Sequence, residues 1–224
     1  MFGPFSRKAR SGQLAAQLPR EPASRVFGFD LGEPIDRRYI ESFLAAHAEK
    51  IAGDVLEIAE STYTRKFGGE RVKRALVLHA TADNPNADIV GDLVTGQGIG
   101  EGIADCFILT QTLPFVFDVR SAARHAVRAL RPGGHLLVTV PGITQISRYD
   151  MDRWGHFWSF TDMSLRRLFE EVVPKDCVEV ATHGNVKVAA CFLYGLPQTA
   201  LSTEDYDQHD PDYQVLITAV VRRP

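Results

Sequence analysis

The sequence predicts an α/β fold in which helices flank a mostly parallel sheet of seven strands. Along the chain, hydrophobic residues switch repeatedly between the spacing typical of helices and that of buried strands. Cys106-Phe107-Ile108-Leu109 is apolar at every position, as expected for a strand covered on both faces. Arg131-Pro132-Gly133-Gly134 then ends a helix directly before another apolar run. Alternation of this kind is typical of a layered α/β domain.

Helices are predicted where apolar residues recur every three or four positions. They cover residues 35–51, 119–130 and 162–173, and Thr161 is the expected cap of the last one. Short apolar runs predict strands at residues 55–58, 75–79, 87–90, 105–111, 135–140, 177–181 and 215–221. Residues 184–196 fit either a helix or a hairpin on the sheet. Their Phe192, Leu193 and Tyr194 suit core packing or a homodimer patch.

Composition indicates one ordinary folded domain. The 224 residues are 45% hydrophobic and 24% charged, which suffices for a single core. We predict a basic, poorly ordered arm over residues 1–30 and one domain over residues 31–224. The arm is either a solvated tail or a segment that seeks phosphate or membrane; its basic residues are Arg7, Lys8, Arg10, Arg20 and Arg25. A formal charge of -3 argues against a general nucleic-acid binder.

The three cysteines are widely spaced in apolar surroundings, which indicates buried thiols in a reducing compartment. They are Cys106, Cys177 and Cys191. The sequence shows neither a signal-peptide pattern nor an apolar run of membrane-spanning length, so we expect a cytoplasmic protein. The acidic run at 204–212, with His183 and His209, has the oxygen and nitrogen atoms of a metal site. Such a run before a final strand is more often a solvated loop, and we predict no metal.

One turn combines an acid at the end of a strand with three positions at which nucleotide-binding loops usually have glycine. The apolar strand Val55-Leu56-Glu57-Ile58 runs into Ala59, Ser61 and Tyr63, which stand where an E-x-G-x-G-x-G pattern places its glycines. Glycine serves such loops because a backbone without Cβ turns sharply and approaches a ligand closely. The turn therefore has the form of a nucleotide-cofactor loop that has lost its glycines.

Over residues 35–222 the element order resembles the class I S-adenosylmethionine-dependent methyltransferases. The resemblance is carried by Val55-Leu56-Glu57-Ile58, Gly91-Asp92-Leu93, residues 105–113 and residues 130–137. It implies a Rossmann-like class I methyltransferase fold, S-adenosylmethionine as cofactor and methyl transfer as activity. Residues 62–69 and 151–158 also look similar to bacterial methyltransferase-domain proteins linked to glycan or natural-product pathways.

The resemblance implies a set of cofactor-binding positions. Glu57 matches the acid that organises the turn and the methionyl amino group, which is the role we favour; the alternative is an acid that only satisfies turn amides. Asp92 and Leu93 match the adenine contacts. Asp83 lies one turn later than the ribose acid, whose own position holds Ala80 and Thr81. The remaining positions are Ala59 and Ser61 in the turn, and Thr110 and Gln111 between cofactor and acceptor.

The acceptor is expected at residues 141–160, after the fifth strand. The candidate substrate-binding residues there are Arg148, Tyr149, Arg153, Trp154 and Trp158. His156 is the candidate base, because an imidazole titrates near neutral pH. Asp150 or Asp152 would orient that imidazole or bind a sugar. A packed lid would use the same residue types, and a lone histidine is often structural.

Two classes of function follow from these residues. In the first, the protein is an O-methyltransferase for a sugar-like or natural-product hydroxyl, with a small-molecule or glycan acceptor. In the second, a methyltransferase-like protein transfers no methyl group and acts as a partner subunit or as an enzyme of other chemistry. Ala59 and Thr81 favour the second class, whereas Asp92 and the dense acceptor loop favour the first.

Overall fold

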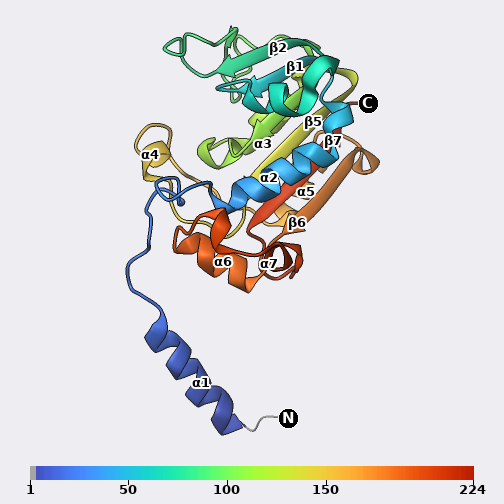
Figure 1. Cartoon of the computed structure of the whole chain (residues 1–224). Helices are drawn as coiled ribbons and strands as arrows, with labels where there is room; N and C mark the ends of the chain where they lie inside the picture. The colour runs from blue at the N-terminus through green and yellow to red at the C-terminus, as the bar shows by residue number, and fades with distance from the viewer. Residues whose placement is uncertain (1–3) are drawn as a thin grey trace.

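The fold is a seven-stranded sheet between two layers of helices. The computed structural model describes residues 4–224, with side-chain surroundings from residue 11 onward. The strands are β1 (Gly53–Ile58), β2 (Val72–His79), β3 (Ile89–Val90), β4 (Ala104–Thr110), β5 (Leu130–Pro141), β6 (Val178–His183) and β7 (Leu216–Arg222). Their order is β3-β2-β1-β4-β5-β7-β6 (Figure 1). All neighbours pair in parallel except β7, which is antiparallel to both β5 and β6.

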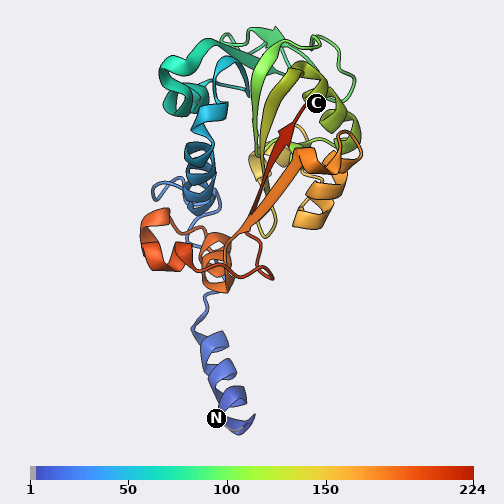
Figure 2. The same ribbon diagram turned by 90° about the vertical axis from the view of Figure 1, so that its right-hand side faces the viewer.

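Helices cover both faces of this sheet. The described α-helices are α1 (Pro4–Gln17), which lies apart from the sheet, α2 (Ile35–Ala46), α3 (Val119–Ala129), α4 (Arg148–Met151), α5 (Asp162–Glu170), α6 (Val186–Leu193) and α7 (Thr203–Asp207). α2 and α6 bury their apolar residues with Val55, Ile108 and Leu137 of the sheet. α3 and α5 bury theirs against the other face, with Phe107 and Val138. Figure 2 shows α2 and α5 on opposite sides of the sheet. The predicted α/β fold is thus confirmed.

Most predicted elements appear with shifted ends. α2 stops at Ala46, and a 3-10 helix follows at Ala48–Lys50, so the helix predicted to residue 51 is shorter. β5 begins at Leu130, because Ala104 pairs with Leu130; the register then shifts before Cys106 pairs with His135, and Gly133 lies there at a φ of 81°. Thr161 caps α5 as predicted, through a capping box with Ser164. Residues 184–196 contain helix α6; Phe192 is buried in the core, whereas Leu193 is exposed.

The N-terminal residues divide into two parts. α1 stands apart from the sheet in both views, and its residues from 11 to 17 are exposed (Figures 1 and 2). Residues 19–29 instead pack on the domain, where Ser24 is buried and the rings of Phe27 and Phe192 lie 5.9 Å apart. The side chains of Arg7, Lys8 and Arg10 lie outside the described residues. The division at residue 30 stays a prediction.

The connection between β1 and β2 is short. It consists of a π-helix at Thr64–Gly68 and a 3-10 helix at Gly69–Arg71, where a longer crossover helix is usual. The other short 3-10 helices are Leu113–Phe115, Lys175–Cys177 and Gln198–Ala200. This connection contacts α2: Lys66 pairs with Glu41 at 2.7 Å, and Glu60 and Tyr63 of the preceding turn border the same cavity as Arg37.

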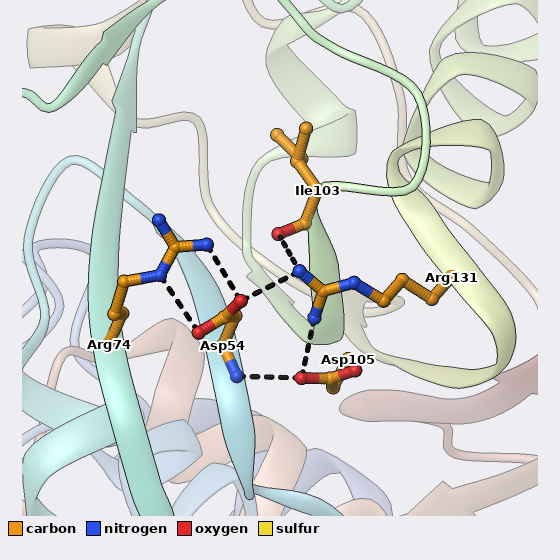
Figure 3. A network of polar contacts seen from close by, with 5 residues as sticks. All are labelled: Asp54, Arg74, Ile103, Asp105 and Arg131. Atoms are coloured by element: carbon orange, nitrogen blue, oxygen red, sulfur yellow. Dashed lines mark hydrogen bonds and ion pairs between the residues drawn. The ribbon is translucent and has the colours of Figure 1, made fainter.

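Four charged side chains tie the sheet together where β1 and β4 begin (Figure 3). The Asp54 carboxylate accepts a forked pair of bonds from Arg74 at 2.9 and 2.7 Å, and a third from Arg131 at 2.7 Å. Arg131 also binds Asp105 at 2.7 Å, and Asp105 accepts the Asp54 amide at 2.8 Å. These arginines hold the pKa of Asp54 far below its usual range. We call these four residues the clamp.

Candidate functional site

A cavity opens at the carboxyl ends of β1, β4 and β5, beneath α2. Ligands of open α/β sheets bind at this edge, because the parallel strands end there together. The cavity has a volume of about 330 Å³. Its polar and aromatic lining residues are Phe27, Phe29, Asp36, Arg37, Glu60, Tyr63, Thr110, Gln111, Phe115, Thr144, Ser147, Asp150 and His156. We call it the central cavity.

Gln111 and Asp36 form a polar pair in this cavity. Gln111 directly follows β4, and its amide binds the Thr139 carbonyl at 2.9 Å. Its φ of 48° is unusual for a residue with a side chain, and such backbone strain clusters at functional sites. The Gln111 Nε2 donates to Asp36 Oδ2 at 2.9 Å, whereas its buried Oε1 has no hydrogen-bond partner within the described structure. The pair thus offers a free acceptor atom beside a carboxyl group.

Burial raises the pKa of Asp36 above its ordinary value, although the bond from Gln111 opposes this shift. A carboxylate with a raised pKa is a stronger base than an exposed carboxylate, because its pKa lies nearer to neutral pH. Asp36 lies at the start of α2, 75 residues before Gln111 in the sequence. The sequence analysis missed it, because nothing in a helix's first turn indicates which strand end it will face.

His156 also lines the central cavity, as a hydrogen-bond donor. Its Nδ1 accepts the Ser147 amide at 3.2 Å, and its ring meets Phe115 edge-on with centroids 5.2 Å apart. Burial lowers its pKa, with a smaller opposing effect from Asp150. The neutral ring then carries its hydrogen on Nε2, since Nδ1 is the acceptor. Nε2 is buried and has no partner among the described residues.

The buried Glu57 side chain stabilises the turn after β1 by accepting backbone hydrogen bonds. Its carboxylate accepts the backbone amides of Tyr63 at 3.1 Å and Thr64 at 2.7 Å, and burial raises its pKa. Glu57 is buried and does not line the central cavity, whereas Tyr63 does. The acid therefore satisfies turn amides, which was one of the two roles expected for it.

Ala59 occupies a backbone conformation that favours glycine. Its φ is 65°, and an alanine there costs roughly 1 kcal/mol relative to glycine. The turn is held by hydrogen bonds from the Ala59 amide to the Leu78 carbonyl at 2.9 Å and from Asn84 Nδ2 to the Ala59 carbonyl at 2.7 Å. Ser61 accepts Arg65 Nε at 3.0 Å. The turn thus keeps a left-handed backbone conformation that usually requires glycine, although the residue there is alanine.

The residues predicted for the adenosine half do not line the central cavity. Asp92 accepts the Val94 amide at 2.7 Å and the Thr95 hydroxyl at 3.0 Å, so it stabilises its own turn. Leu93 is buried in the core. Asp83 is exposed, accepts the Thr81 hydroxyl and lies 3.6 Å from His79 Nδ1.

The residues predicted to bind the acceptor do not gather at one site. Asp150 and His156 line the central cavity, whereas Asp152 is exposed and ends α4. The Arg153 guanidinium stacks 3.5 Å above the Tyr149 ring. The remaining three residues contact other parts of the fold.

Trp154 meets His79 at the end of β2, with ring centroids 6.4 Å apart. Trp158 donates from Nε1 to the Val116 carbonyl at 3.0 Å and lines a separate cavity between α3 and α5. Arg148 lines a third cavity. The tryptophans therefore do not gather around one acceptor pocket.

Within the described part of the chain, no three or more histidine, cysteine or acidic side chains gather as metal ligands. His183 and His209 instead contact Thr218 and Thr182 at 3.1 and 2.8 Å. Among residues 4–224, no helix has the length and apolar character needed to span a bilayer.

Comparison with known proteins relates this arrangement to methyltransferases. No protein-family model matches the sequence, and no curated protein matches it. A solved S-adenosylmethionine-dependent methyltransferase from Archaeoglobus fulgidus is similar, with a TM-score of 0.54, 8% identity, and coverage of 84% of this chain and 94% of that one. The N-methyltransferase NodS from Bradyrhizobium japonicum, solved with S-adenosyl-L-homocysteine, has a TM-score of 0.54, 17% identity, and coverage of 92% and 95%.

A protein of other chemistry shares the likeness. The [4+2]-cyclase SpnF has a TM-score of 0.50 and 13% identity, with coverage of 82% of this chain and 81% of that one. At these identities the comparisons establish the fold alone. Together with the strand order β3-β2-β1-β4-β5-β7-β6 and the antiparallel β7, they show that this chain has the class I methyltransferase fold.

Proposed function

We propose that the protein is an S-adenosylmethionine-dependent O-methyltransferase for a sugar-like or natural-product hydroxyl. The central cavity is the observation that carries this proposal. Gln111, His156 and Asp36 line it together, and the buried atoms Gln111 Oε1 and His156 Nε2 have no hydrogen-bond partner among the described residues, which supports a ligand that binds them. Buried polar atoms without protein partners are rare, and a ligand that binds both explains them.

The charges of the central cavity fit a cationic cofactor. Asp36, Glu60 and Asp150 line it against one cation, Arg37, which is paired with Glu33 at 2.7 Å. S-adenosylmethionine carries an ammonium and a sulfonium group, and it would supply the methyl group on the sulfonium. The cavity residues proposed to hold it are Thr110, Gln111, Glu60 and Tyr63. Glu57, Ala59 and Ser61 would shape the turn beside it, and Asp83, Asp92 and Leu93, which lie outside this cavity, stay sequence-based candidates for the adenosine half.

In this proposal the acceptor hydroxyl binds between His156 and Asp36. His156 Nε2–H donates to the hydroxyl oxygen, and Asp36 accepts the hydroxyl proton as the oxygen becomes a nucleophile. The bond from Gln111 fixes the orientation of the Asp36 carboxylate. The aromatic walls formed by Phe27 and Phe115 exclude water from the reacting atoms.

His156 as the base is the alternative assignment. A proton can enter at Nε2 only if the existing hydrogen moves to Nδ1, and that breaks the 3.2 Å contact with the Ser147 amide. Asp150, which accepts the Ser147 hydroxyl at 2.5 Å, would then help to stabilise the imidazolium. Asp36 needs no such rearrangement and is the base that we favour.

Two observations favour a second function, a methyltransferase-like protein that transfers no methyl group. Ala59 fills a glycine conformation, and Asp92 is engaged by its own turn. A partner subunit or an enzyme of other chemistry would tolerate both. The fold is compatible with this function, since a cyclase shares it.

A methyl-transfer assay tests the main proposal. Purified protein is incubated with methyl-labelled S-adenosylmethionine and a panel of sugar and phenolic hydroxyl compounds. We expect label in at least one product, and about a hundredfold lower turnover for His156→Ala with little change in cofactor affinity. The matched control His209→Ala, on the loop before β7, should keep full turnover. Unlabelled products across the panel, despite cofactor binding, would favour the second function.

A further inference from the structure

The cavity that Arg148 lines, beside the central one, has three arginines in its lining. It has a volume of about 460 Å³. Arg20 and Arg25 come from the segment before α2, and Arg148 comes from the first residue of α4. Pro19, Pro22, Gln145, Ile146, Leu193 and Tyr194 complete its lining. We call it the arginine cavity.

The positive charge of the arginine cavity is poorly balanced. Arg25 pairs with Glu21, and both side chains are mostly exposed, so this pair is weak. The Arg20 and Arg148 side chains have no hydrogen bond or ion pair to any residue that the structure describes. Among the described residues that line it, none carries a carboxylate. In a chain with a formal charge of -3, such a concentration of guanidinium groups is not explained by general basicity.

The backbone that carries two of these arginines is fixed to the domain. The Tyr194 hydroxyl donates to the Pro19 carbonyl at 2.9 Å, and the Ala23 amide donates to the Tyr194 carbonyl at 2.8 Å. On the other side, Gln145 Nε2 donates to the Arg25 carbonyl at 2.8 Å. The backbone of these arginines is thus already ordered, so less conformational entropy is lost when a ligand binds between them.

We propose that the arginine cavity binds the phosphate group of a ligand. A guanidinium group offers paired N–H donors whose geometry matches phosphate oxygens, and it keeps its charge at all physiological pH values. Exposed Ile146 and Leu193 place apolar surface beside the arginines. This combination suits the phosphate of a soluble metabolite or that of a lipid headgroup, and the shared chemistry is a phosphate ester with an apolar neighbour.

The two cavities share one wall. Thr144 and Ser147 line the central cavity, whereas Gln145 and Ile146 between them line the arginine cavity. An acceptor with its hydroxyl in the central cavity can therefore extend its phosphate to Arg148. This extension rests on the proposed function, but the phosphate site itself does not, because it is tested by binding alone.

Calorimetric titration with inorganic pyrophosphate at low ionic strength tests the site. We expect saturable binding that weakens with added salt, and a loss of affinity of about tenfold or more in Arg148→Met and in Arg20→Met. Arg148→Lys keeps the charge but not the forked donors and should be intermediate. Arg167→Met is the matched control, since Arg167 is an exposed arginine of α5 that lines another cavity. It should bind as the unmodified protein does.

Vesicles distinguish the two phosphate sources. Cosedimentation with phosphatidylcholine vesicles that contain phosphatidic acid, lost in Arg148→Met, would assign a lipid headgroup. Pyrophosphate binding without cosedimentation would assign a soluble phosphate ester. Absence of both, or an equal loss of binding in Arg167→Met, would overturn the proposal. Neither result depends on S-adenosylmethionine, so failure here is distinct from failure of methyl transfer.

Discussion

The two edges of the sheet use carboxyl groups in opposite ways. At the amino edge, the clamp surrounds Asp54 with two arginines, and its pKa falls (Figure 3). At the carboxyl edge, the Asp36 carboxyl group accepts the Gln111 side-chain amide at 2.9 Å, and its pKa rises because burial outweighs the bonds that oppose this shift. The clamp has a partner for each charge, whereas Gln111 Oε1 and His156 Nε2, on residues that line the central cavity, have no partner in the described part of the chain.

This difference indicates that the clamp contributes to the stability of the fold, whereas the carboxyl edge contributes to function. A carboxylate that is fully bonded in the folded state stabilises the fold and has little remaining capacity for a ligand. A buried carboxyl group beside unpartnered atoms destabilises the fold and is available for binding or proton transfer. The following variants test that separation, from the largest expected effect to the smallest.

The largest effect is expected for Asp36→Asn. Loss of the proposed base should lower methyl transfer about a hundredfold, equivalent to about 2.7 kcal/mol in the activation barrier. The free energy of unfolding should stay the same or rise, because a costly buried charge is removed. Turnover and urea unfolding are the two measurements. Asp176→Asn, an exposed acid before β6, is the control. Full turnover in Asp36→Asn would leave His156 as the remaining candidate base.

The next effect is on stability. Asp54→Ala removes three charge-assisted hydrogen bonds of the clamp, so the free energy of unfolding should fall by roughly 2 kcal/mol. Asp105→Ala should cost less, because the Asp105 side chain is 43% exposed whereas that of Asp54 is 13% exposed. Cofactor affinity should change in neither variant. Equal losses in the two variants would contradict the ranking by burial.

The two edges should also respond oppositely to pH. Asp54 has a lowered pKa, so its stabilisation is present above the unfolded value of about 3.9 and is lost as pH falls through the folded value. Asp36 has a raised pKa, so its ionisation lowers stability as pH rises past the unfolded value. Urea unfolding from neutral to acidic pH should show a shallower acid loss in Asp54→Asn than in the unmodified protein. A steeper loss would contradict the assignment.

The smallest effect is expected for Ala59→Gly. Glycine relieves the left-handed conformation at φ 65°, so the free energy of unfolding should rise by about 0.5–1 kcal/mol. Ala45→Gly, at an exposed position of α2, should lower it by about 1 kcal/mol. A rise in cofactor affinity with Ala59→Gly would indicate a decayed loop, and a fall would indicate a turn rebuilt around alanine.

The sequence was sufficient for the fold because its signals are local. The apolar run at Cys106–Leu109 predicted a strand covered on both faces, and β4 is that strand. Thr161 signalled the start of α5 through side-chain capping, which depends on residues three positions apart. The predicted ends of helices and strands were less accurate where pairing with a distant strand decides them. Leu130, for example, belongs to β5 because it pairs with Ala104.

The site was predictable only in part because it depends on distant contacts. Thr110, Gln111, Asp150 and His156 do meet at the central cavity. Asp36 was not foreseen, since the packing of α2 over the sheet decides what it faces. Trp158 was expected at the acceptor but is turned toward α3 and α5 by the bond from its indole to Val116. Such a bond, across 42 residues, leaves no mark in sequence spacing.

Titration of the purified protein with S-adenosylmethionine and S-adenosylhomocysteine by calorimetry tests the central claim most directly. If the carboxyl edge is a cofactor site, both should bind at about micromolar strength, near -8 kcal/mol, and Gln111→Leu should weaken both. Asp54→Asn, in the clamp, should bind as the unmodified protein does. Absence of binding to the folded protein, with an unfolding transition that neither compound shifts, would contradict the claim and favour a methyltransferase-like protein without methyl transfer.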